Sequence, residues 1–324
     1  MNIDAIRAAA GRINGHAVRT PLLNAPLLDD AFGRRIFVKA ECLQKTGSFK
    51  YRGARSAISA LSAAEQGKGV LAYSSGNHAQ GIACAAAELG APATIIMPKD
   101  APRLKIENTK RYGAEVVLYD RAAGESREDL GRDLSEARGL TLIKPYDHPE
   151  VIAGQGTVGL EIAEDAASLG IDEAEVLVCC GGGGLTSGTA LALAADAPGL
   201  RVHPVEPEGF DDVARSLSSG QISTNNALSG SICDAIMTPS PGQLTFPILK
   251  AHCGSGVVVS DDDALRAMAL AWQRLKIVLE PGGAVALAAA LFHRGDDSGD
   301  VIAVASGGNV DGDIFARALD LYAA

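Results

Sequence analysis

The sequence predicts an α/β protein with mainly parallel, twisted sheets that are flanked by helices and arranged in two lobes. Short runs rich in β-branched and apolar residues alternate with Ala- and Leu-rich segments of helical length. Several of these runs are apolar on both faces, which is typical of parallel strands covered by helices on both sides. With 324 residues, of which 47% are hydrophobic, the chain is long enough for two lobes that share an interface.

Six β-strands are expected, and turn-forming residues or helical segments separate them. In chain order the expected strands are residues 69–75 (GVLAYSS), 93–98 (ATIIMP), 114–120 (AEVVLYD), 174–184 (AEVLVCCGGGG), 201–207 (RVHPVEP) and 301–309 (VIAVASGGN).

Two polar crossings divide the chain into domains. Residues 62–69 and 144–151 combine Gly or Pro with charged residues, which is typical of connections between domains. They predict a small α/β domain at residues 66–148, inserted into a large domain that consists of residues 1–65 and 149–324.

Unusual residues stand where four of the expected strands end. In sheets of this class, ligands bind beyond the carboxyl ends of the strands. We therefore expect these four strand ends to converge on one crevice. They are SSGNH (74–78), GGGGL (181–185), VEPEGFDD (205–212) and SGGN (306–309).

The composition excludes several classes of partner. A formal charge of -10 and a pI near 5.1 would repel nucleic acids and anionic membranes. No apolar run of about 20 residues is present to span a bilayer, and the N-terminal MNIDAIRAAAGRI lacks the apolar core of a secretory signal. We expect a cytoplasmic protein with cysteines that are buried thiols, because their spacing is neither CxxC nor metal-binding. The cysteines are Cys42, Cys84, Cys179, Cys180, Cys233 and Cys253.

The glycine run Gly181 to Gly184 indicates a phosphate site. It precedes LTSGTALALAA, which has the composition of a helix. Unpaired N–H groups and the dipole at a helix N-terminus bind phosphate, and residues without Cβ leave the backbone open. The run matches neither GxxxxGK[ST] nor GxGxxG, so one small phosphate monoester is favoured over a nucleoside triphosphate or a dinucleotide. The alternative is a tight strand-to-helix turn.

Lys50 lies between Phe49 and Tyr51 in KTGSFKYRGA, so its amine is expected to be partly buried. Burial lowers the pKa of a lysine, and a neutral amine attacks aldehydes. Together with one phosphate, this predicts pyridoxal 5'-phosphate as the cofactor. The alternative is an exposed lysine at the start of a helix.

Two carboxylates in VEPEGFDD indicate a cation site. Glu206 and Asp212 offer hard oxygen ligands to Mg²⁺, Ca²⁺ or Mn²⁺, and the Phe210 carbonyl and water would complete the shell. The alternative is a solvated acidic loop.

Five motifs together resemble the serine/threonine dehydratases and eukaryotic serine racemase, which are pyridoxal-phosphate enzymes of fold type II, the tryptophan synthase β-like fold. The motifs are TGSFKYRGA, SSGNHAQG, VIAGQGT, GGGGL and SGGNVD, and the resemblance runs from about residue 19 to residue 311. Tyr51 and Arg52 resemble the dehydratase branch, since cysteine and threonine synthases typically have Asp-Arg there. The resemblance implies elimination of water from a β-hydroxy amino acid to give a 2-oxo acid and ammonia. It also implies a homodimer and a cation at Glu206 and Asp212.

The resemblance implies cofactor contacts for the motif residues. Lys50 would bind the cofactor aldehyde as an imine and later remove the Cα proton, and Phe49 would lie behind the ring. Asn77 would hydrogen-bond the ring hydroxyl and Ser306 the pyridine nitrogen. A hydroxyl cannot protonate the ring as a carboxylate would, which favours elimination over transamination. The phosphate would be held by Gly181, Gly182, Gly183, Gly184 and Leu185.

The resemblance also assigns the substrate carboxylate to one backbone segment. This segment consists of Ser74, Ser75, Gly76, Asn77 and His78. Ser75 matches the serine that reprotonates the opposite face of the substrate in serine racemase. A serine- or aspartate-type racemase with dehydratase side activity is therefore the alternative function.

Arg127 bears on the choice of substrate. It matches an arginine that approaches the second carboxylate of dicarboxylate ligands in serine racemase, which makes 3-hydroxyaspartate a candidate beside L-threonine and L-serine. The alternative is a surface ion pair of Arg127 with Glu125 or Asp129.

Some features depart from the relatives or exclude rival classes. Tyr146 stands where serine racemase has an asparagine near the cofactor, which puts that contact in doubt. An isoleucine-sensing regulatory domain is not expected after residue 311. A Rossmann oxidoreductase should show GxGxxG and a later acidic residue, and a non-catalytic binding protein would have no use for Lys50 or Ser306.

Overall fold

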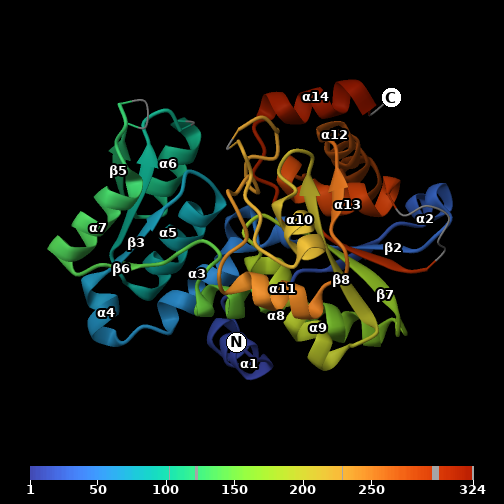
Figure 1. The fold of residues 1–324 in the computed structure, drawn as a ribbon, viewed down its shortest axis with the longest axis horizontal. Coiled ribbons are helices and arrows are strands. Elements are labelled where there is room, and N and C mark those ends of the chain that lie inside the picture. Colours follow the sequence, from blue (N-terminus) through green and yellow to red (C-terminus); the bar gives the residue numbers. More distant parts are fainter. Residues whose placement is uncertain (102, 121–122, 228, 294–298, 323–324) are drawn as a thin grey trace.

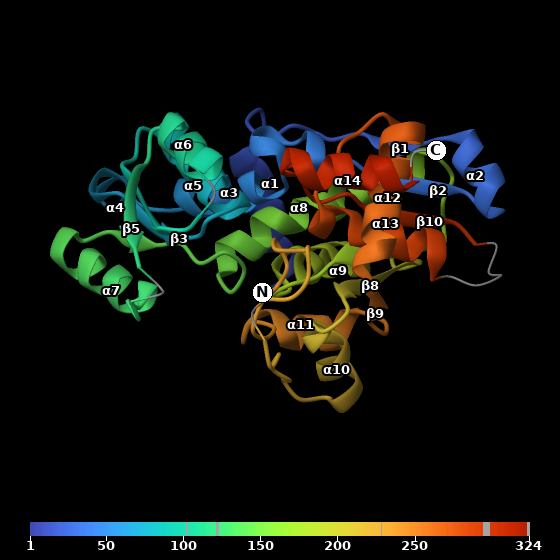
Figure 2. The ribbon, with the colours of Figure 1, turned by 90° about the horizontal axis from the view of Figure 1, so that it is seen from above.

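Two lobes lie side by side in the structure, each built around one sheet with helices on both faces (Figure 1). The computed structural model describes residues 1–101, 103–120, 123–227, 229–293 and 299–322. The two lobes can also be distinguished in the view from above (Figure 2). The expected α/β class with mainly parallel sheets is confirmed.

The larger sheet has six strands and crosses the right-hand lobe of Figure 1. Its neighbouring strands are parallel except for β1, which is antiparallel to β2. All residues of β2 and β10 are buried, as expected for strands that helices cover on both faces. In spatial order the strands are β1 (Leu22–Asn24), β2 (Ile36–Lys39), β10 (Val301–Val304), β7 (Ala174–Cys179), β8 (Leu200–Pro207) and β9 (Val257–Val259).

The smaller sheet has four parallel strands. In spatial order they are β5 (Glu115–Tyr119), β4 (Ala93–Pro98), β3 (Val70–Tyr73) and β6 (Thr141–Leu142). The six strands expected from the sequence are all present, although most are shorter than expected. The sequence missed β1, β2, β6 and β9, which have only two to four residues each and therefore give little periodic signal.

Helices connect the strands and cover the sheets. The first half of the chain contains α1 (Ile3–Ile13), α2 (Pro26–Phe32), α3 (Lys50–Ser59), α4 (Ala63–Lys68), α5 (Asn77–Leu89), α6 (Arg103–Arg111), α7 (Arg127–Arg138) and α8 (Pro149–Ser168). The second half contains α9 (Gly184–Asp196), α10 (Asp212–Ser219), α11 (Thr245–His252), α12 (Asp261–Leu270), α13 (Pro281–Phe292) and α14 (Gly312–Tyr322). Short helical turns are η1 (Glu41–Leu43), η2 (Lys45–Gly47) and the π-helical η3 (Ala271–Leu275).

Glycines on α8 bring two other helices into close contact with it. A Cβ on Gly154 would lie 2.5 Å from the Arg52 carbonyl oxygen in α3, and one on Gly159 would lie 2.7 Å from the Thr189 carbonyl oxygen in α9. Only glycine permits such an approach of two backbones. Gly154 in the motif VIAGQGT and Gly159 just beyond it thus let α3, which begins with Lys50, and α9, which begins in the glycine run, pack against one helix.

A buried ion cluster fixes α3 to the larger lobe. Arg52 is 1% exposed and donates to the carboxylates of Glu41 and Glu161, both at 2.7 Å. The fully buried Lys39 joins the cluster through Glu161, at 2.8 Å. The charges compensate one another, which burial requires. Arg52 therefore serves to anchor the helix that carries Lys50.

The helix α3 also packs into the smaller lobe. Tyr51, Ala54 and Ile58 belong to the buried cluster around the smaller sheet, together with Val70 and Ile82. The division of the chain into residues 1–65 with 149–324 and residues 66–148 stays a prediction, and α3 contributes to the cores on both sides of it.

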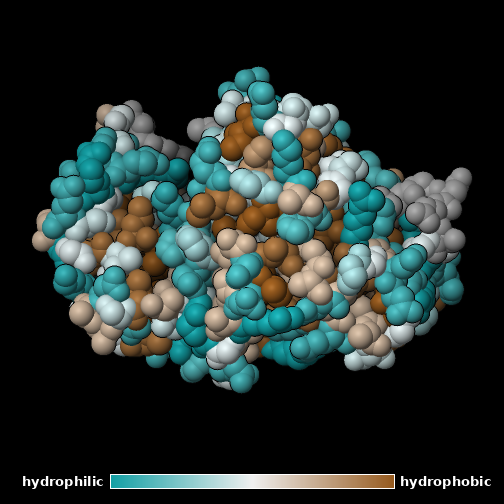
Figure 3. Space-filling view, turned by 60° about the horizontal axis from the view of Figure 1, so that its bottom comes forward, coloured by the Kyte–Doolittle hydropathy of each residue, from teal (hydrophilic) through white to brown (hydrophobic). Residues whose placement is uncertain are grey.

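The cysteines differ in part from the expectation. Four are buried, but Cys84 and Cys253 are half-buried because they lie at the edges of apolar clusters. In Figure 3 hydrophobic residues show on both lobes within a largely hydrophilic surface. Within the described part of the chain, no helix has the length and apolar character needed to cross a membrane.

Candidate active site

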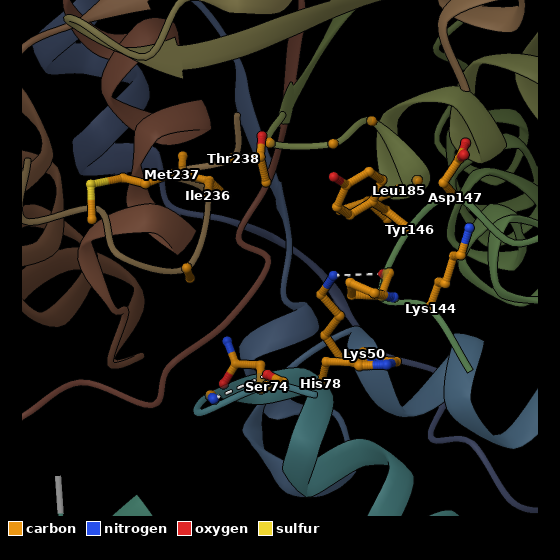
Figure 4. Close-up of a pocket in the computed structure, with 18 of the residues that line it drawn as sticks. Lys50, Ser74, His78, Lys144, Tyr146, Asp147, Leu185, Ile236, Met237 and Thr238 are labelled. Carbon is orange, nitrogen blue, oxygen red and sulfur yellow. Dashed lines mark hydrogen bonds between the residues drawn. The ribbon is translucent and has the colours of Figure 1, made fainter. Parts of the chain in front are cut away.

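A cavity of about 580 Å³ is lined by residues from both lobes. The sequence-predicted residues for cofactor and substrate all line it, although they come from five separate segments. Lys50, Ser74, His78 and Leu185 of this set are labelled in Figure 4. They are Phe49, Lys50, Ser74, Ser75, Gly76, Asn77, His78, Arg127, Gly181, Gly182, Gly183, Gly184, Leu185 and Ser306. The convergence of strand ends is therefore confirmed for three of the four segments.

Lys50 is the first residue of α3 and points into the cavity (Figure 4). Its Nζ donates to the Pro145 carbonyl oxygen at 3.0 Å and lies 4.9 Å from the centre of the Phe49 ring. Burial lowers the pKa of Lys50 to about 8. A substantial fraction of this amine is therefore neutral at physiological pH, as nucleophilic attack on an aldehyde requires.

The segment from Ser74 to His78 lies between β3 and α5. Gly76 caps α5 and no side chain accepts from the first turn there, so the N–H groups of this turn are open to an anion. His78 donates from Nε2 to the Ile143 carbonyl oxygen at 2.9 Å. Burial lowers the pKa of His78 to about 3, so the ring is neutral and adds no charge.

The glycine run connects β7 to α9. Gly183 has φ +89°, a conformation that favours glycine, and a Cβ on Gly184 would lie 2.5 Å from Gln155 Oε1. The first helical hydrogen bond runs from the Ser187 N–H to the Gly183 carbonyl oxygen. The N–H groups of the residues between them thus have no acceptor within the helix. The run is a tight turn as well as a fitting cradle for a phosphate group.

Tyr146 packs directly on the glycine run. A Cβ on Gly182 would lie 2.2 Å from the Tyr146 ring, so this glycine is needed for packing as well as for backbone access. Burial raises the pKa of the Tyr146 hydroxyl. Arg127 and Tyr73 also line the cavity, and the Arg127 guanidinium lies 5.4 Å from the centre of the Tyr73 ring.

Arg127 begins α7 and pairs with its neighbour. Its Nε donates to Glu128 Oε1 at 2.7 Å. The alternative of a surface ion pair is therefore present, but its partner is Glu128 and neither Glu125 nor Asp129; Asp129 pairs with Arg132 at 2.7 Å. The Arg127 side chain is about half exposed and lines the cavity.

Ser306 follows β10 and is 4% exposed. Its carbonyl oxygen accepts from the Phe49 N–H at 3.1 Å, which ties the residue before Lys50 to the tip of β10. Cys179, at the end of β7, lines the same wall, and burial raises the pKa of its thiol to about 11. This thiol is therefore protonated, and its side-chain hydrogen bond with Ser306 offsets the effect of burial only in part.

Glu206, Phe210 and Asp212 do not line the cavity, so the fourth strand end lies elsewhere. Glu206 is fully buried and accepts from the Val213 and Ala214 N–H groups at 2.9 and 2.7 Å. These bonds turn its carboxylate towards the start of α10 and away from the crevice. The expectation of four converging strand ends is wrong at this point.

The buried carboxyl groups of Glu206 and Asp212 lie near each other, so it is unfavourable for both to be ionised. Asp212 is fully buried, and its Oδ2 has no hydrogen-bond partner among the described residues. Burial raises the pKa of Asp212 to about 6. Burial and the nearby Asp212 raise the pKa of Glu206 well above its usual range. Two buried carboxylates with an unused oxygen are a donor set that fits a hard divalent cation.

Sequence reasoning missed two parts of the cavity wall. Glu280 is 4% exposed and precedes α13; an acidic residue inside the apolar stretch VLEPGGAVALAAALF was the available signal. Lys105 and Asp234 form an ion pair of 3.1 Å between the lobes. They lie 129 positions apart, so no local sequence pattern predicts the pair.

Comparisons with known proteins agree with this geometry. A family model described as pyridoxal-phosphate dependent enzyme matches residues 13–307. An L-threo-3-hydroxyaspartate ammonia-lyase from Pseudomonas sp is 44% identical over 317 residues, which cover 98% of this chain and 97% of the relative. A serine racemase from Schizosaccharomyces pombe is 42% identical, with coverage of 98% and 96%. The crystal structure of a threonine deaminase from T.th. superimposes with a TM-score of 0.90 at 45% identity, over 96% of this chain and 99% of that one.

Proposed function

The chain belongs to the pyridoxal-phosphate dependent enzyme family, and on this premise we propose that it is an ammonia-lyase for β-hydroxy amino acids. It removes water from the substrate and yields a 2-oxo acid and ammonia. The observation that carries the proposal is the Lys50 amine, whose pKa is lowered to about 8, in one cavity with a phosphate cradle.

The residues present fit the cofactor. The glycine run and the open N–H groups of α9 would hold the phosphate, Phe49 would lie against the ring, and Ser306 would meet the pyridine nitrogen. Lys50 would hold the aldehyde carbon. When bound, pyridoxal 5'-phosphate supplies an electron-withdrawing ring that stabilises negative charge at the Cα of an attached amino acid.

Lys50 acts as the general base. Its amine, once free and neutral, accepts the Cα proton of the substrate, a role that typically contributes about 10²–10⁴-fold to the rate. The Pro145 carbonyl oxygen, 3.0 Å from Nζ, holds this amine at the cavity wall. The neutral His78 places no competing positive charge beside it.

The segment from Ser74 to His78 binds the substrate carboxylate. The Asn77 and His78 N–H groups stand in the first turn of α5, where the helix dipole favours an anion, whereas the Ser74 N–H donates to the Ile96 carbonyl oxygen and the Gly76 N–H to Ser74 Oγ, both at 3.2 Å. This fixes the amino acid with its Cα near Lys50.

We take 3-hydroxyaspartate as the preferred substrate. Arg127 lines the cavity and has N–H groups beyond the one that binds Glu128, and a second substrate carboxylate would accept from them. The L-threo-3-hydroxyaspartate ammonia-lyase of Pseudomonas sp supports the same substrate class.

The test compares kcat/KM for L-threo-3-hydroxyaspartate, L-threonine and L-serine, measured as 2-oxo acid and ammonia formed. We expect 3-hydroxyaspartate to lead. Arg127→Ala should reduce kcat/KM for this substrate by roughly tenfold or more and leave L-threonine within about threefold. No turnover of any of the three would refute the ammonia-lyase; an equal loss for all three would refute only the role of Arg127.

Racemisation is the second candidate function. Ser75 lines the same cavity as Lys50, and the Schizosaccharomyces pombe relative is a serine racemase. Its hydroxyl would return a proton to Cα on the face opposite Lys50. Chiral analysis of L-serine recovered after incubation decides the matter, since complete absence of D-serine would remove this activity.

Three further properties belong to the proposal. Glu206, the Phe210 carbonyl and Asp212 would bind Mg²⁺, Ca²⁺ or Mn²⁺, as their buried carboxylates suggest. The protein would act as a cytoplasmic homodimer, which sedimentation analysis against the chain mass of 33.3 kDa would test. A mass of one chain at micromolar concentration would contradict the dimer.

A further inference from the structure

Four residues from distant segments form a hydrogen-bonded row at one end of the cavity. Asn309 Nδ2 donates to the Thr46 carbonyl oxygen and to Asn77 Oδ1, both at 2.7 Å. Asn77 Nδ2 in turn donates to Glu280 Oε1 at 2.6 Å. Asn77 and Glu280 line the cavity, whereas Thr46 and Asn309 stand behind them.

The backbone carbonyl at Thr46 fixes the direction of every bond in this row. A carbonyl oxygen only accepts, so the atom of Asn309 that faces it must be the NH₂ group. The same NH₂ group faces Asn77, which must therefore present its oxygen. The NH₂ group of Asn77 is thus turned towards Glu280, which offers an acceptor oxygen in both its ionised and its protonated form.

The surrounding backbone is shaped for this row. Thr46 has φ +61°, which is unusual for a β-branched residue, and directs its carbonyl group at Asn309. A Cβ on Gly47 would lie 2.5 Å from Asn309 Oδ1, and one on Gly307 would lie 1.8 Å from Glu280 Oε1. A side chain at either glycine would displace Asn309 or Glu280. Glycine is therefore needed in the loop before α3 and in the loop after β10 for this hydrogen-bonded row to form.

We propose that Asn309 and Glu280 are positioning residues that force Asn77 to act as a hydrogen-bond donor, and never as an acceptor, towards the cofactor ring. An amide nitrogen has two hydrogens, and Glu280 takes one of them. The other would be left to donate to the ring oxygen of a bound cofactor and would stabilise that oxygen as an anion. The inference rests on the proposed placement of the cofactor ring beside Asn77.

The experiment measures dissociation constants of the apoprotein for pyridoxal 5'-phosphate and for its 3-deoxy analogue, which lacks the ring oxygen. The wild-type protein should prefer pyridoxal 5'-phosphate. Asn309→Asp replaces the donor by an acceptor, so the Asn77 amide should turn over and present its oxygen to the ring. We expect affinity for pyridoxal 5'-phosphate to fall by roughly tenfold or more, while that for the analogue stays within about threefold.

Two variants of Glu280 provide a second line of evidence. Glu280→Leu removes the acceptor without adding charge and should also reduce the preference for pyridoxal 5'-phosphate. Glu280→Gln keeps a carbonyl acceptor and should retain the preference. Asn2→Asp is the matched control for the change of amide to carboxylate, because Asn2 caps α1 and aspartate caps a helix equally well.

The outcomes separate this inference from the proposed function. If the wild-type protein binds neither compound, the cofactor placement itself is wrong. If the wild-type protein binds both equally, or if the wild-type preference persists in Asn309→Asp and in Glu280→Leu, the positioning role is wrong and the cofactor placement stands.

Discussion

At the scale of single residues, Lys50 shows how much of a side chain's environment the neighbouring sequence can predict. Its aromatic neighbours predicted partial burial, and the structure adds the cause of its lowered pKa and the carbonyl that receives its amine. Pro145 lies far along the chain from Lys50, so no reading of KTGSFKYRGA supplies this partner. The acidic Glu280 stood out in an apolar stretch, but its partner Asn77 lies in another segment, so the sequence did not show its role.

We predict that apoprotein captures pyridoxal 5'-phosphate with a rate that rises with pH and is half-maximal near pH 8. Only the neutral amine attacks the aldehyde, and the pKa of Lys50 is lowered to about 8. Stopped-flow absorbance at several pH values measures this rate. In Glu280→Gln the midpoint should move lower, because the Glu280 carboxylate raises the pKa of Lys50. A midpoint near the usual lysine value of 10.5 would contradict the assigned burial.

The same pKa shift has a consequence for stability. Between about pH 8 and pH 10.5 the unfolded chain binds more protons at Lys50 than the folded chain. The unfavourable contribution of this residue is therefore complete below pH 8 and is relieved as the pH rises.

At the scale of elements, the strand ends and helix starts were the most predictable features. The glycine run, SSGNH and SGGN were assigned to one crevice from their positions after apolar strands, and the glycine run, SSGNH and Ser306 of SGGN line one cavity. Glu206 was assigned to the same crevice and is not there, because the N-terminus of α10 binds its carboxylate. Whether a residue at a strand end faces the cavity depends on where the next helix begins. The sequence of the strand does not predict that position.

Gly182 gives an element-scale prediction. Gly182→Ala should destabilise the protein by about 1–3 kcal/mol and weaken cofactor binding, because the added methyl group would overlap the Tyr146 ring. Gly11→Ala is the control: Gly11 lies in α1 with open space around it, and this change should stabilise by about 0.5–1 kcal/mol. Urea unfolding of both variants measures the effects. Equal stability of Gly182→Ala and the wild type would mean that Tyr146 moves freely away.

Glu206 at the end of β8 and Asp212 at the start of α10 give a second prediction at this scale. Removal of divalent cations with a chelator should lower Tm by roughly 3 °C or more at about pH 8, since two buried carboxylates lose their compensating charge. The effect should shrink at about pH 5. The folded-state pKa of Asp212 is raised to about 6 from 3.8, so protonation below it replaces the cation and restores stability.

Asp212→Asn is the matched variant for this measurement. It removes one charge and keeps the shape, so its Tm should respond little to the chelator. A wild-type Tm that is the same with and without chelator at both pH values would exclude a cation from this pair.

At the scale of the whole molecule, the class of fold followed from composition and alternation, whereas the arrangement that makes a site did not. Sequence reasoning found the elements that carry Lys50 and the glycine run. The sequence did not show that α3 and α9 both pack on α8 at Gly154 and Gly159, or that the buried Arg52 anchors α3. These contacts join residues that are far apart in the chain, and they depend on backbone distances that only the assembled fold defines. The contacts of α3 and α9 with α8 thus bring Lys50 and the glycine run to the same site.

The most direct test of the account is the location of the cofactor after reduction. Holoprotein treated with borohydride and digested should yield, by mass spectrometry, one peptide with the reduced pyridoxal-phosphate adduct on Lys50, and Lys50→Ala should yield none. An adduct on another lysine of the wild-type protein, or no adduct at all, would contradict the central claim that this buried amine holds the cofactor.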